Sequence, residues 1–451
     1  MQQVAEHLSQ QAYRQAFVRL WVLGLNGATL REWERKRPDA QGFALAKASY
    51  KTSLDNGHSF DAETVAQNPL AMLQALDEDI AASSAHSAPG MRRRNRAANQ
   101  YLEDGKRYWL LPVRLNNRRK AALAQQPGNL IHWVHHHCVL PTETPHGIKV
   151  ALQFTQSSVD DKLHALWSAG KPQLKVWIAH FDDQAALKGS THQSAVGDWQ
   201  ATHIEPSQVR LASLQSSIDQ AQVAGAHVIV FPELTVDLAQ RALLIKRLRQ
   251  QPGGSLVLMQ VGSFHETVPA EGKTFNTAPL VNAQGRELLV HRKLRPFSKV
   301  APGEDAVTED ISLGDTIHVL ATPVGLLTIL ICKDFLDDHP SVLSLLSDVP
   351  VEWVLVPSFG DEKTIRKHKE RAKAQGLVRT GSHIALAQIF NNLDDPARQP
   401  SECVRGFGHI GGNSSPESQV PENGGLVVFP LQREVPPQAA KPNRPDLRRI
   451  K

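Results

Sequence analysis

Three short apolar runs in the sequence each end near a side chain that can take part in chemistry. HVIVFPEL leads to Glu233, LLVHRK ends at Lys293, and TILIC ends at Cys332. In open α/β sheets, ligands bind beyond the carboxyl ends of the strands. Neighbouring strands could therefore bring a carboxylate, an ammonium and a thiol together, although about a hundred residues separate the first from the last.

These groups together would make a minimal site for acyl transfer. A thiolate is a strong nucleophile, but a free thiol near neutral pH is mostly protonated. The Glu233 carboxylate can accept the thiol proton as Cys332 attacks a carbonyl-like carbon. The Lys293 ammonium offsets the effect of that carboxylate on the thiol. It can also face the oxygen that becomes negative in the tetrahedral intermediate, where the backbone N–H of Lys333 could be a second donor.

The segments around these residues predict an α/β fold. Apolar runs that alternate with helical patterns from about residue 172 are typical of a sheet covered by helices. LVNAQGRELLV predicts a hairpin with Gly285 in its turn. The predicted strands are 174–181, 227–234, 255–264, 288–293, 317–334, 351–358 and 383–390, and the predicted helices are 205–224, 237–250 and 364–380.

Three longer stretches, GAHVIVFPELTV, HRKLRPF and GLLTILICKDF, resemble the motifs of the nitrilase, or carbon–nitrogen hydrolase, superfamily. The resemblance covers roughly residues 172–432 and implies a four-layer α-β-β-α sandwich. It also implies that Glu233 is the general base, Lys293 the oxyanion-stabilising ammonium and Cys332 the nucleophile. The expected activity is that of a thiol-dependent amidohydrolase acting on a non-peptide amide, carbamoyl compound or nitrile, with amides favoured. The resemblance further implies a homo-oligomer, and no metal or organic cofactor, because the nucleophile is a side chain.

A second glutamate between the lysine and the cysteine is also implied by the resemblance, and it would position the lysine and the incoming water. The candidates are Glu304 and Glu309. We favour Glu309, because it precedes Gly314 in EDISLGD much as the family's glutamate precedes its turn. CKDFLDDHP departs from the family where Lys333 follows the nucleophile, and the substrate pocket is therefore not predicted.

The region 1–171 is expected to be mainly helical and partly basic. Its segment 92–120 contains ten Lys or Arg residues and two acidic residues, interleaved with Tyr101, Tyr108 and Trp109. Basic and aromatic residues together can hold single-stranded nucleic acid. Without a recognisable binding fold around them, a solvated basic face or a surface for a partner protein is favoured over nucleic acid. The alternative function is thus a nitrilase-like scaffold or small-molecule sensor whose N-terminal region binds a protein or nucleic acid, as in bacterial defence proteins.

The segment HWVHHHC (132–138) contains four histidines and a cysteine. Structural zinc sites use two separated pairs of ligands, and no second pair is visible in the sequence. We therefore expect a polar helix or loop here and no metal site.

Bulk properties set the remaining expectations. The chain has 451 residues, which is enough for two or three folding units, and a net charge of +5 that indicates no particular partner. Three cysteines at unrelated spacings give no disulfide framework and favour a reducing, cytoplasmic setting. No apolar run approaches the roughly 20 residues that a membrane helix needs. The expected division is an N-terminal region 1–171, a sandwich domain 172–432 and a flexible basic, proline-containing tail 433–451.

Overall fold

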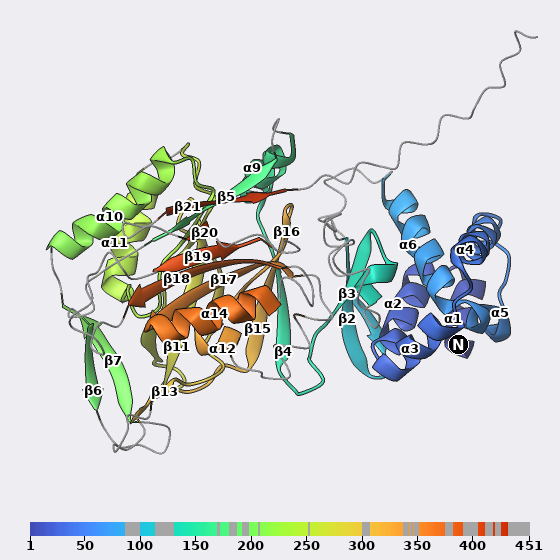
Figure 1. Ribbon diagram of the computed structural model, residues 1–451, viewed down its shortest axis with the longest axis horizontal. Helices are drawn as coiled ribbons and strands as arrows, with labels where there is room; N and C mark the ends of the chain where they lie inside the picture. Colours follow the sequence, from blue (N-terminus) through green and yellow to red (C-terminus); the bar gives the residue numbers. More distant parts are fainter. Residues whose placement is uncertain are drawn as a thin grey trace, which may run out of the picture.

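The computed structural model describes most of the chain outside its connecting segments and C-terminal end. The described residues are 1–85, 100–112, 130–168, 172–179, 187–191, 198–205, 208–250, 253–299, 307–336, 342, 346, 351–374, 382–390, 405–410, 418–419 and 425–431. A helical N-terminal part and a larger β-sandwich lie side by side along the longest axis of the molecule (Figure 1). The predicted tail 433–451 and the alternative second glutamate, Glu304, lie outside the described residues.

The N-terminal part begins with helices around an apolar core. The spacing of Phe17, Leu20, Trp21 and Gly24 places all four on the buried face of one helix. Side chains that accept backbone N–H groups begin three of the helices, as Asn26 does for α3. The helices are α1 (Gln2–Ser9), α2 (Tyr13–Gly24), α3 (Gly27–Lys36), α4 (Ala40–Asp55), α5 (Ala62–Gln67) and α6 (Pro69–Ala85).

A small antiparallel sheet follows these helices. It has the order β1 (Gln100–Glu103), β2 (Lys106–Pro112), β3 (His137–Pro141), and a short helix η2 (Leu130–Trp133) precedes β3. Tyr108 is buried, and Tyr101 and Trp109 pack against the same core. These three aromatic residues of the basic segment therefore serve the core, which leaves less of their surface for stacking on nucleic acid bases.

The histidine-rich segment HWVHHHC runs from η2 into β3, and is therefore partly a strand where we expected a helix or loop. The buried Asp77 of α6 accepts the backbone N–H groups of His135 and His136, and lies 2.9 Å from Nδ1 of His137. A carboxylate on a neighbouring helix thus anchors the start of the strand. No group of three or more His, Cys, Asp or Glu side chains within the described residues could hold a metal ion.

Two seven-stranded sheets form the sandwich. The first has the order β10-β11-β9-β8-β5-β21 with β12 beside β11, and the second has the order β20-β19-β18-β17-β16-β15-β4. The strands of the first sheet are β5 (Gln173–Ile178), β8 (Val228–Val230), β9 (Leu258–Gln260), β10 (Phe264–Val268), β11 (Lys273–Asn282), β12 (Glu287–Arg292) and β21 (Gly425–Pro430). Those of the second sheet are β4 (Lys149–Phe154), β15 (Thr316–Thr322), β16 (Gly325–Ile329), β17 (Val351–Gly360), β18 (His383–Phe390), β19 (Gly406–His409) and β20 (Ser418–Gln419).

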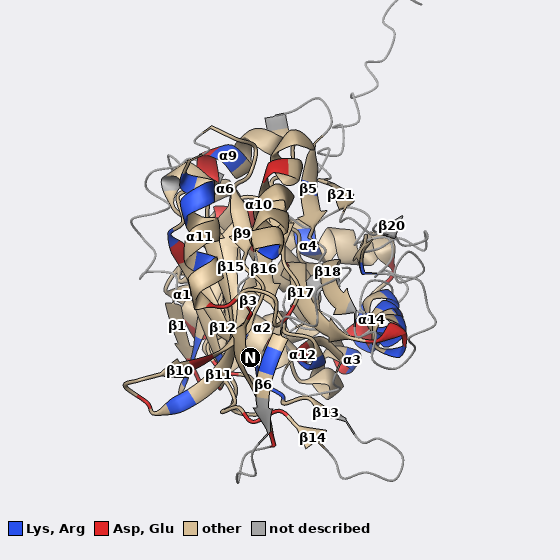
Figure 2. Ribbon diagram, turned by 90° about the vertical axis from the view of Figure 1, so that its left-hand side faces the viewer, with Lys and Arg blue, Asp and Glu red and all other residues tan. Residues whose placement is uncertain are grey.

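Helices cover the outer face of each sheet, which makes four layers (Figure 1). Helices α10 (Gln208–Val223) and α11 (Leu238–Arg249) share an apolar cluster with the first sheet. Helices α12 (Lys333–Leu336) and α14 (Glu362–Ala374) contribute to the cluster on the second sheet. Figure 2 shows charged residues on the outer helices α9 (Ser157–Ser168), α11 and α14, while the strands between them are mostly uncharged. The predicted α-β-β-α sandwich is confirmed.

The strands pair in parallel where helices connect them. β5, β8 and β9 are parallel neighbours, as are β16, β17 and β18. Parallel strands need such crossover connections, because a tight turn can join only antiparallel strands. The predicted hairpin is present: β11 and β12 pair antiparallel, and Gly285 in its turn has φ of 69°.

The second sheet includes residues from before position 172, where we expected the sandwich to begin. β4 pairs in parallel with β15, and α9 (Ser157–Ser168) follows it, with Trp167 Nε1 donating to Pro323 O at 3.0 Å. β4 is an edge strand with only one fully buried residue, Val150, and its sequence therefore carries little of the apolar pattern that marks a strand. Within the described residues, no helix has the length and apolar character needed to cross a membrane.

Two short hairpins were not expected from the sequence. β6 (Leu187–Thr191) pairs with β7 (Trp199–Ile204), between β5 and α10. β13 (Ser298–Lys299) pairs with β14 (Val307–Thr308), between the predicted lysine and the second glutamate. Both lie at the same end of the sandwich (Figure 1).

Candidate active site

The structure brings the predicted carboxylate, ammonium and thiol together from both sheets. Glu233 follows β8 and Lys293 follows β12 in the first sheet, while Cys332 follows β16 in the second. β17 joins them: the N–H of Glu233 donates to Ser358 O at 3.3 Å, and that of Cys332 donates to Pro357 O at 2.9 Å. The ends of three strands thus meet at one place between the sheets.

Lys293 lies between two glutamates. Its Nζ donates to Glu233 Oε1 at 2.7 Å and to Glu309 Oε2 at 2.7 Å, and all three side chains are no more than 2% exposed. Asn276 of β11 donates from Nδ2 to both carboxylates, at 3.0 Å and 2.9 Å. One ammonium therefore faces two carboxylates in a site without bulk water, and the three charges leave one negative charge in excess.

The two glutamates have opposite pKa shifts. Burial raises the pKa of Glu233, and the nearby charge of Glu309 raises it further, against the effects of Lys293 and of a hydrogen bond with Cys332. Burial alone would also raise the pKa of Glu309, but Lys293 and His265 together hold it well below its usual range. Pairs of acids whose environments separate their pKa values in this way are typical of acid–base catalysis.

The Lys293 ammonium stays charged in this setting. Burial by itself would lower the pKa of Lys293, but the two carboxylates, together with Cys332, raise it above its ordinary value. The side chain is therefore a fixed positive charge rather than a proton donor, and it can stabilise negative charge that develops beside it.

Cys332 is buried at the junction of the sheets. Its Sγ lies 3.5 Å from Ser358 Oγ, 3.6 Å from Phe359 O and 3.9 Å from His368 Nε2. Burial and the charge of Glu233 raise the pKa of the thiol to about 12, against the opposing effect of Lys293. The resting group is thus a thiol, and it needs a base to become a nucleophile.

The backbone is strained at Cys332 and beside Glu233. Cys332 has φ of 42° and Leu234 has φ of 56°, in the left-handed region that side chains other than glycine avoid. Each costs about 1–2 kcal/mol. Such strain is found where the surrounding structure holds a functional side chain in place.

Asp334 supplies part of that support. Its Oδ1 accepts the N–H groups of Leu294 and Arg295 at 2.9 and 3.0 Å, and its Oδ2 accepts that of Ile331 at 3.2 Å. His291 Nε2 lies 3.0 Å from the same Oδ2. A fully buried carboxylate therefore ties the chain after Lys293 to the chain before Cys332, and this aspartate is structural.

The remaining predicted residue is Lys333, whose backbone N–H was expected to face the oxyanion. Lys333 is the first residue of α12, directly after Cys332. An N–H at this position of a helix has no partner within the helix. Its side chain is half-buried.

Several residues of the site were not predicted from the sequence. They are Asn276, His265, Ser358, His368 and Asp334. A weak signal existed for Asn276, because it interrupts the apolar strand TFNTAPLV, and a buried polar residue in a strand needs a partner. His368 and Ser358 lie on separate elements from Cys332, and no local pattern connects them.

The comparison with protein families agrees with this geometry. Residues 200–339, which include Glu233, Lys293, Glu309 and Cys332, match the family model described as carbon-nitrogen hydrolase. This segment of the chain is similar to the carbon-nitrogen hydrolase family. The match leaves outside it everything up to β6, which includes the N-terminal helices, the small sheet, β4 and β5, and also β17, α14 and the strands that follow them.

A curated protein that is similar to this chain is distant in sequence. Nitrilase homolog 2 of Dictyostelium discoideum is 25% identical over an alignment of 205 residues, and the match covers 43% of this chain and 60% of that protein. The chain thus matches less than two thirds of the length of this curated relative.

Solved structures of similar proteins include Nit3 of Saccharomyces cerevisiae, a member of the nitrilase superfamily. It is 17% identical with a TM-score of 0.39, and the match covers 58% of this chain and 91% of that one. An amidase from Nesterenkonia sp. is 18% identical with a TM-score of 0.38, over 58% of this chain and 91% of that one.

Proposed function

We propose that the protein is a thiol-dependent amidohydrolase that cleaves a non-peptide C–N bond in a small amide through an acyl-Cys332 intermediate. The observation that carries the proposal is the buried Lys293 ammonium, which two carboxylates share beside the strained cysteine. The carbon–nitrogen hydrolase match over the residues concerned supports the same reaction class.

In the first half of the reaction, Glu233 takes the thiol proton while Sγ of Cys332 attacks the carbonyl carbon. The carbonyl oxygen becomes an oxyanion, which the Lys293 ammonium and the Lys333 N–H stabilise. The protonated Glu233 then gives its proton to the amide nitrogen as the C–N bond breaks. Ammonia or an amine leaves, and a thioester remains on Cys332.

In the second half, a water molecule attacks the thioester carbon and Glu233 takes a proton from it. The C–S bond breaks, the carboxylic acid leaves, and the thiolate regains its proton from Glu233. The raised pKa of Glu233 suits this role, because the group must both accept and return a proton in each half of the cycle. Glu309, whose pKa is lowered, stays ionised and holds Lys293 in place.

The chain offers a matched pair of cysteines to test this proposal. Cys332 and Cys138 are both buried, and Cys138 belongs to β3 of the N-terminal part. We expect Cys332→Ala to lower ammonia release from a panel of small amides by about 10³-fold or more, because no other side chain replaces the nucleophile. Cys138→Ala should leave the rate unchanged.

Intact-mass analysis of the wild-type protein, stopped with acid during turnover, should show one acyl group, and peptide mapping should place it at residue 332. Retention of activity in Cys332→Ala, or the absence of turnover with every amide of the panel, would contradict the proposal.

A further inference from the structure

Two carboxylates that share one ammonium compete for the same proton, and their other partners decide between them. Glu309 accepts donors on both oxygens: Oε1 lies 2.8 Å from His265 Nε2 and 2.9 Å from Asn276 Nδ2, and Oε2 lies 2.7 Å from Lys293 Nζ. Oε2 also accepts the N–H of Phe297 at 2.8 Å. The donors from Asn276 and Lys293 to Glu233, by contrast, both reach its Oε1.

Two donors distinguish Glu309 from Glu233, the Phe297 N–H and His265, since Lys293 and Asn276 contact both glutamates. Of these two, His265 is the one whose donor belongs to a side chain. Its Nδ1 accepts the backbone N–H of Ala201 at 2.8 Å. In a neutral imidazole the hydrogen then lies on Nε2, which points at Glu309. The side chain is 0% exposed, and no water competes for that hydrogen bond.

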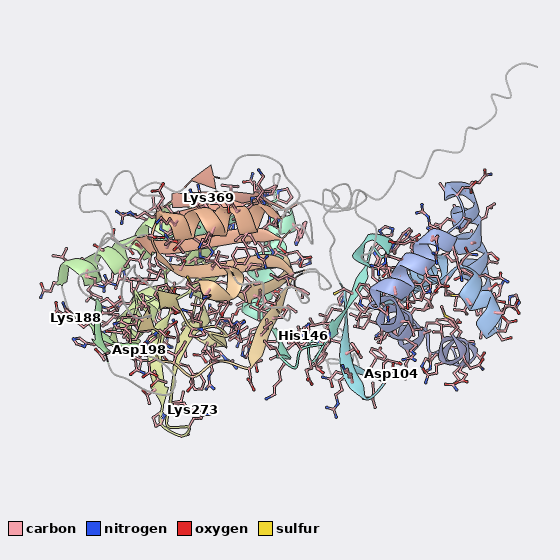
Figure 3. The ribbon with its side chains drawn as sticks, turned by 60° about the horizontal axis from the view of Figure 1, so that its bottom comes forward. Asp104, His146, Lys188, Asp198, Lys273 and Lys369 are labelled. Carbon is pink, nitrogen blue, oxygen red and sulfur yellow. The ribbon has the colours of Figure 1, made fainter. Side chains whose placement is uncertain are left out.

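The β6–β7 hairpin holds His265 and the segment of Glu309 together. On β7, Trp199 packs edge-on against the His265 ring with 5.6 Å between centroids, and its carbonyl accepts the N–H of Asp310 at 2.6 Å. At the start of the strand, the N–H of Asp198 donates to Thr308 O at 2.8 Å. Figure 3 labels Asp198 and Lys188 on this hairpin, at the end of the sandwich opposite the N-terminal part.

A glycine on β6 makes the position of Trp199 possible. A Cβ at Gly189 would lie 2.3 Å from Nε1 of the Trp199 ring, so a larger residue there would displace the ring from its place beside His265. The hairpin, the histidine and the second glutamate are therefore packed as one unit.

We propose that His265 is a positioning residue that supplies Glu309, the fixed partner of Lys293, with a donor of its own, and so lets Lys293 and Asn276 also stabilise the anion of Glu233, the carboxylate that exchanges a proton with Cys332. This inference rests on the proposed function. A carboxylate that accepts several hydrogen bonds is stabilised as the anion. Without the histidine N–H, the Lys293 ammonium and the Asn276 amide would be drawn toward Glu309. They would then stabilise the anion of Glu233 less.

Two substitutions test the contacts of the two His265 ring nitrogens separately. His265→Asn can keep an acceptor near the Ala201 N–H but is too short to reach Glu309, whereas His265→Gln can place an N–H donor near the position of Nε2. His227→Asn is a matched control, because His227 Nδ1 also accepts a strand N–H, that of Lys175 at 3.0 Å, at the opposite end of β8 from Glu233.

The main measurement is the rate of Cys332 alkylation by iodoacetamide as a function of pH, followed by mass spectrometry on the full chain. It requires no turnover, so a failure of the proposed amidase reaction would not affect it. We expect the acid limb of the alkylation rate to move to higher pH by about half a unit or more in His265→Asn. One pKa unit corresponds to 1.36 kcal/mol, which is slightly less than one hydrogen bond to a charged group contributes. The limb should stay at its wild-type position in His265→Gln and His227→Asn. If amides are substrates, the acid limb of kcat/KM should move in the same way.

An unchanged acid limb in folded His265→Asn, or an equal shift in His265→Gln or His227→Asn, would overturn the inference. Histidine-ring ¹⁵N spectra of the wild-type protein give a second test that needs no destabilised variant. The signals that disappear in His265→Gln should show a hydrogen on Nε2 and none on Nδ1, and the opposite tautomer would also overturn it.

Discussion

Asp77 in the N-terminal part and Glu309 in the sandwich are buried carboxylates with similar partners and different surroundings. Asp77 is 0% exposed and Glu309 is 2% exposed. Each accepts backbone N–H groups and contacts a histidine ring, His137 in one case and His265 in the other. Beside Glu309, however, lie the Lys293 ammonium and a second carboxylate next to a thiol.

This difference shows what separates a structural carboxylate from a reactive one. Backbone N–H groups and a histidine are enough to bury Asp77, and it anchors a strand. Asp334, which lies next to the reactive residues, is of the same structural kind, because it too accepts backbone N–H groups from two segments. Chemistry is indicated where two acids compete for one cation beside a nucleophile, because their proton affinities are then pushed apart.

The largest expected effect comes from removing the shared cation. Lys293→Met leaves two buried carboxylates without a countercharge, and we expect a loss of about 3–5 kcal/mol in the free energy of unfolding. Turnover of the remaining folded protein should fall by about 10²-fold or more, since an oxyanion donor is lost. Asp77→Asn should cost about 1–3 kcal/mol through its unmatched hydrogen bonds and leave turnover per folded molecule unchanged. Urea unfolding measures the free energy of unfolding of each variant, and the rate per folded molecule measures its turnover. A loss of turnover per folded molecule in Asp77→Asn would contradict the distinction between Asp77 and the carboxylates beside Lys293.

A smaller effect concerns the two glutamates, whose contributions to stability should depend on pH in opposite ways. The pKa of Glu309 is lower in the folded protein than its ordinary value, so its ionisation stabilises the fold above about pH 4.5 and this contribution is lost as pH falls through the folded pKa. The pKa of Glu233 is raised, and its ionisation therefore costs stability as pH rises through the folded pKa.

At pH 7, Glu309→Gln should consequently destabilise the protein by about 1–3 kcal/mol, whereas Glu233→Gln should be neutral or stabilising. Urea unfolding of the two isosteric variants at pH 7 and at lower pH checks this, and the difference between them should shrink below about pH 4.5. Equal destabilisation at pH 7 would show that the two carboxylates are equivalent.

The smallest effect concerns the neutral groups behind the nucleophile. Ser358 Oγ lies 3.5 Å from Cys332 Sγ and 3.0 Å from His368 Nε2, and burial lowers the pKa of His368 to about 3, which keeps that ring neutral. Ser358→Ala removes a long hydrogen bond to the Cys332 sulfur, and the rate of Cys332 alkylation should fall by about 2- to 10-fold, which corresponds to the roughly 0.5–1.5 kcal/mol of a typical hydrogen bond. Ser382→Ala is the control, since Ser382 is also fully buried and donates to Val351 O. Its alkylation rate should match that of the wild type, and a similar fall in both variants would assign the effect to general packing.

Much of the sandwich could be predicted because its strands are apolar on both faces and its helices have separate, regular patterns. β8, β16 and β17 were recognisable in this way, and the resemblance of the segment before Gly314 to the family's turn favoured Glu309 as the second glutamate. A Cβ at Gly314 would lie 2.4 Å from Arg292 O, next to Lys293, so this glycine allows the chain after Glu309 to pass close to the lysine strand. β4 and the β6–β7 hairpin were missed, since an edge strand and a short exposed hairpin bury too little apolar surface to leave a clear pattern.

The sequence by itself determined which side chains stand at the ends of the strands, because alternation and apolar runs are local properties that can be read along the chain. Only the tertiary structure decided that Lys293 contacts two glutamates, that His265 and Asn276 complete their hydrogen bonds, and that Asp334 accepts backbone N–H groups beside them. These contacts join residues that are 16 to 60 positions apart in the chain. They depend on the register between strands and on the packing of the two sheets, which no local pattern specifies.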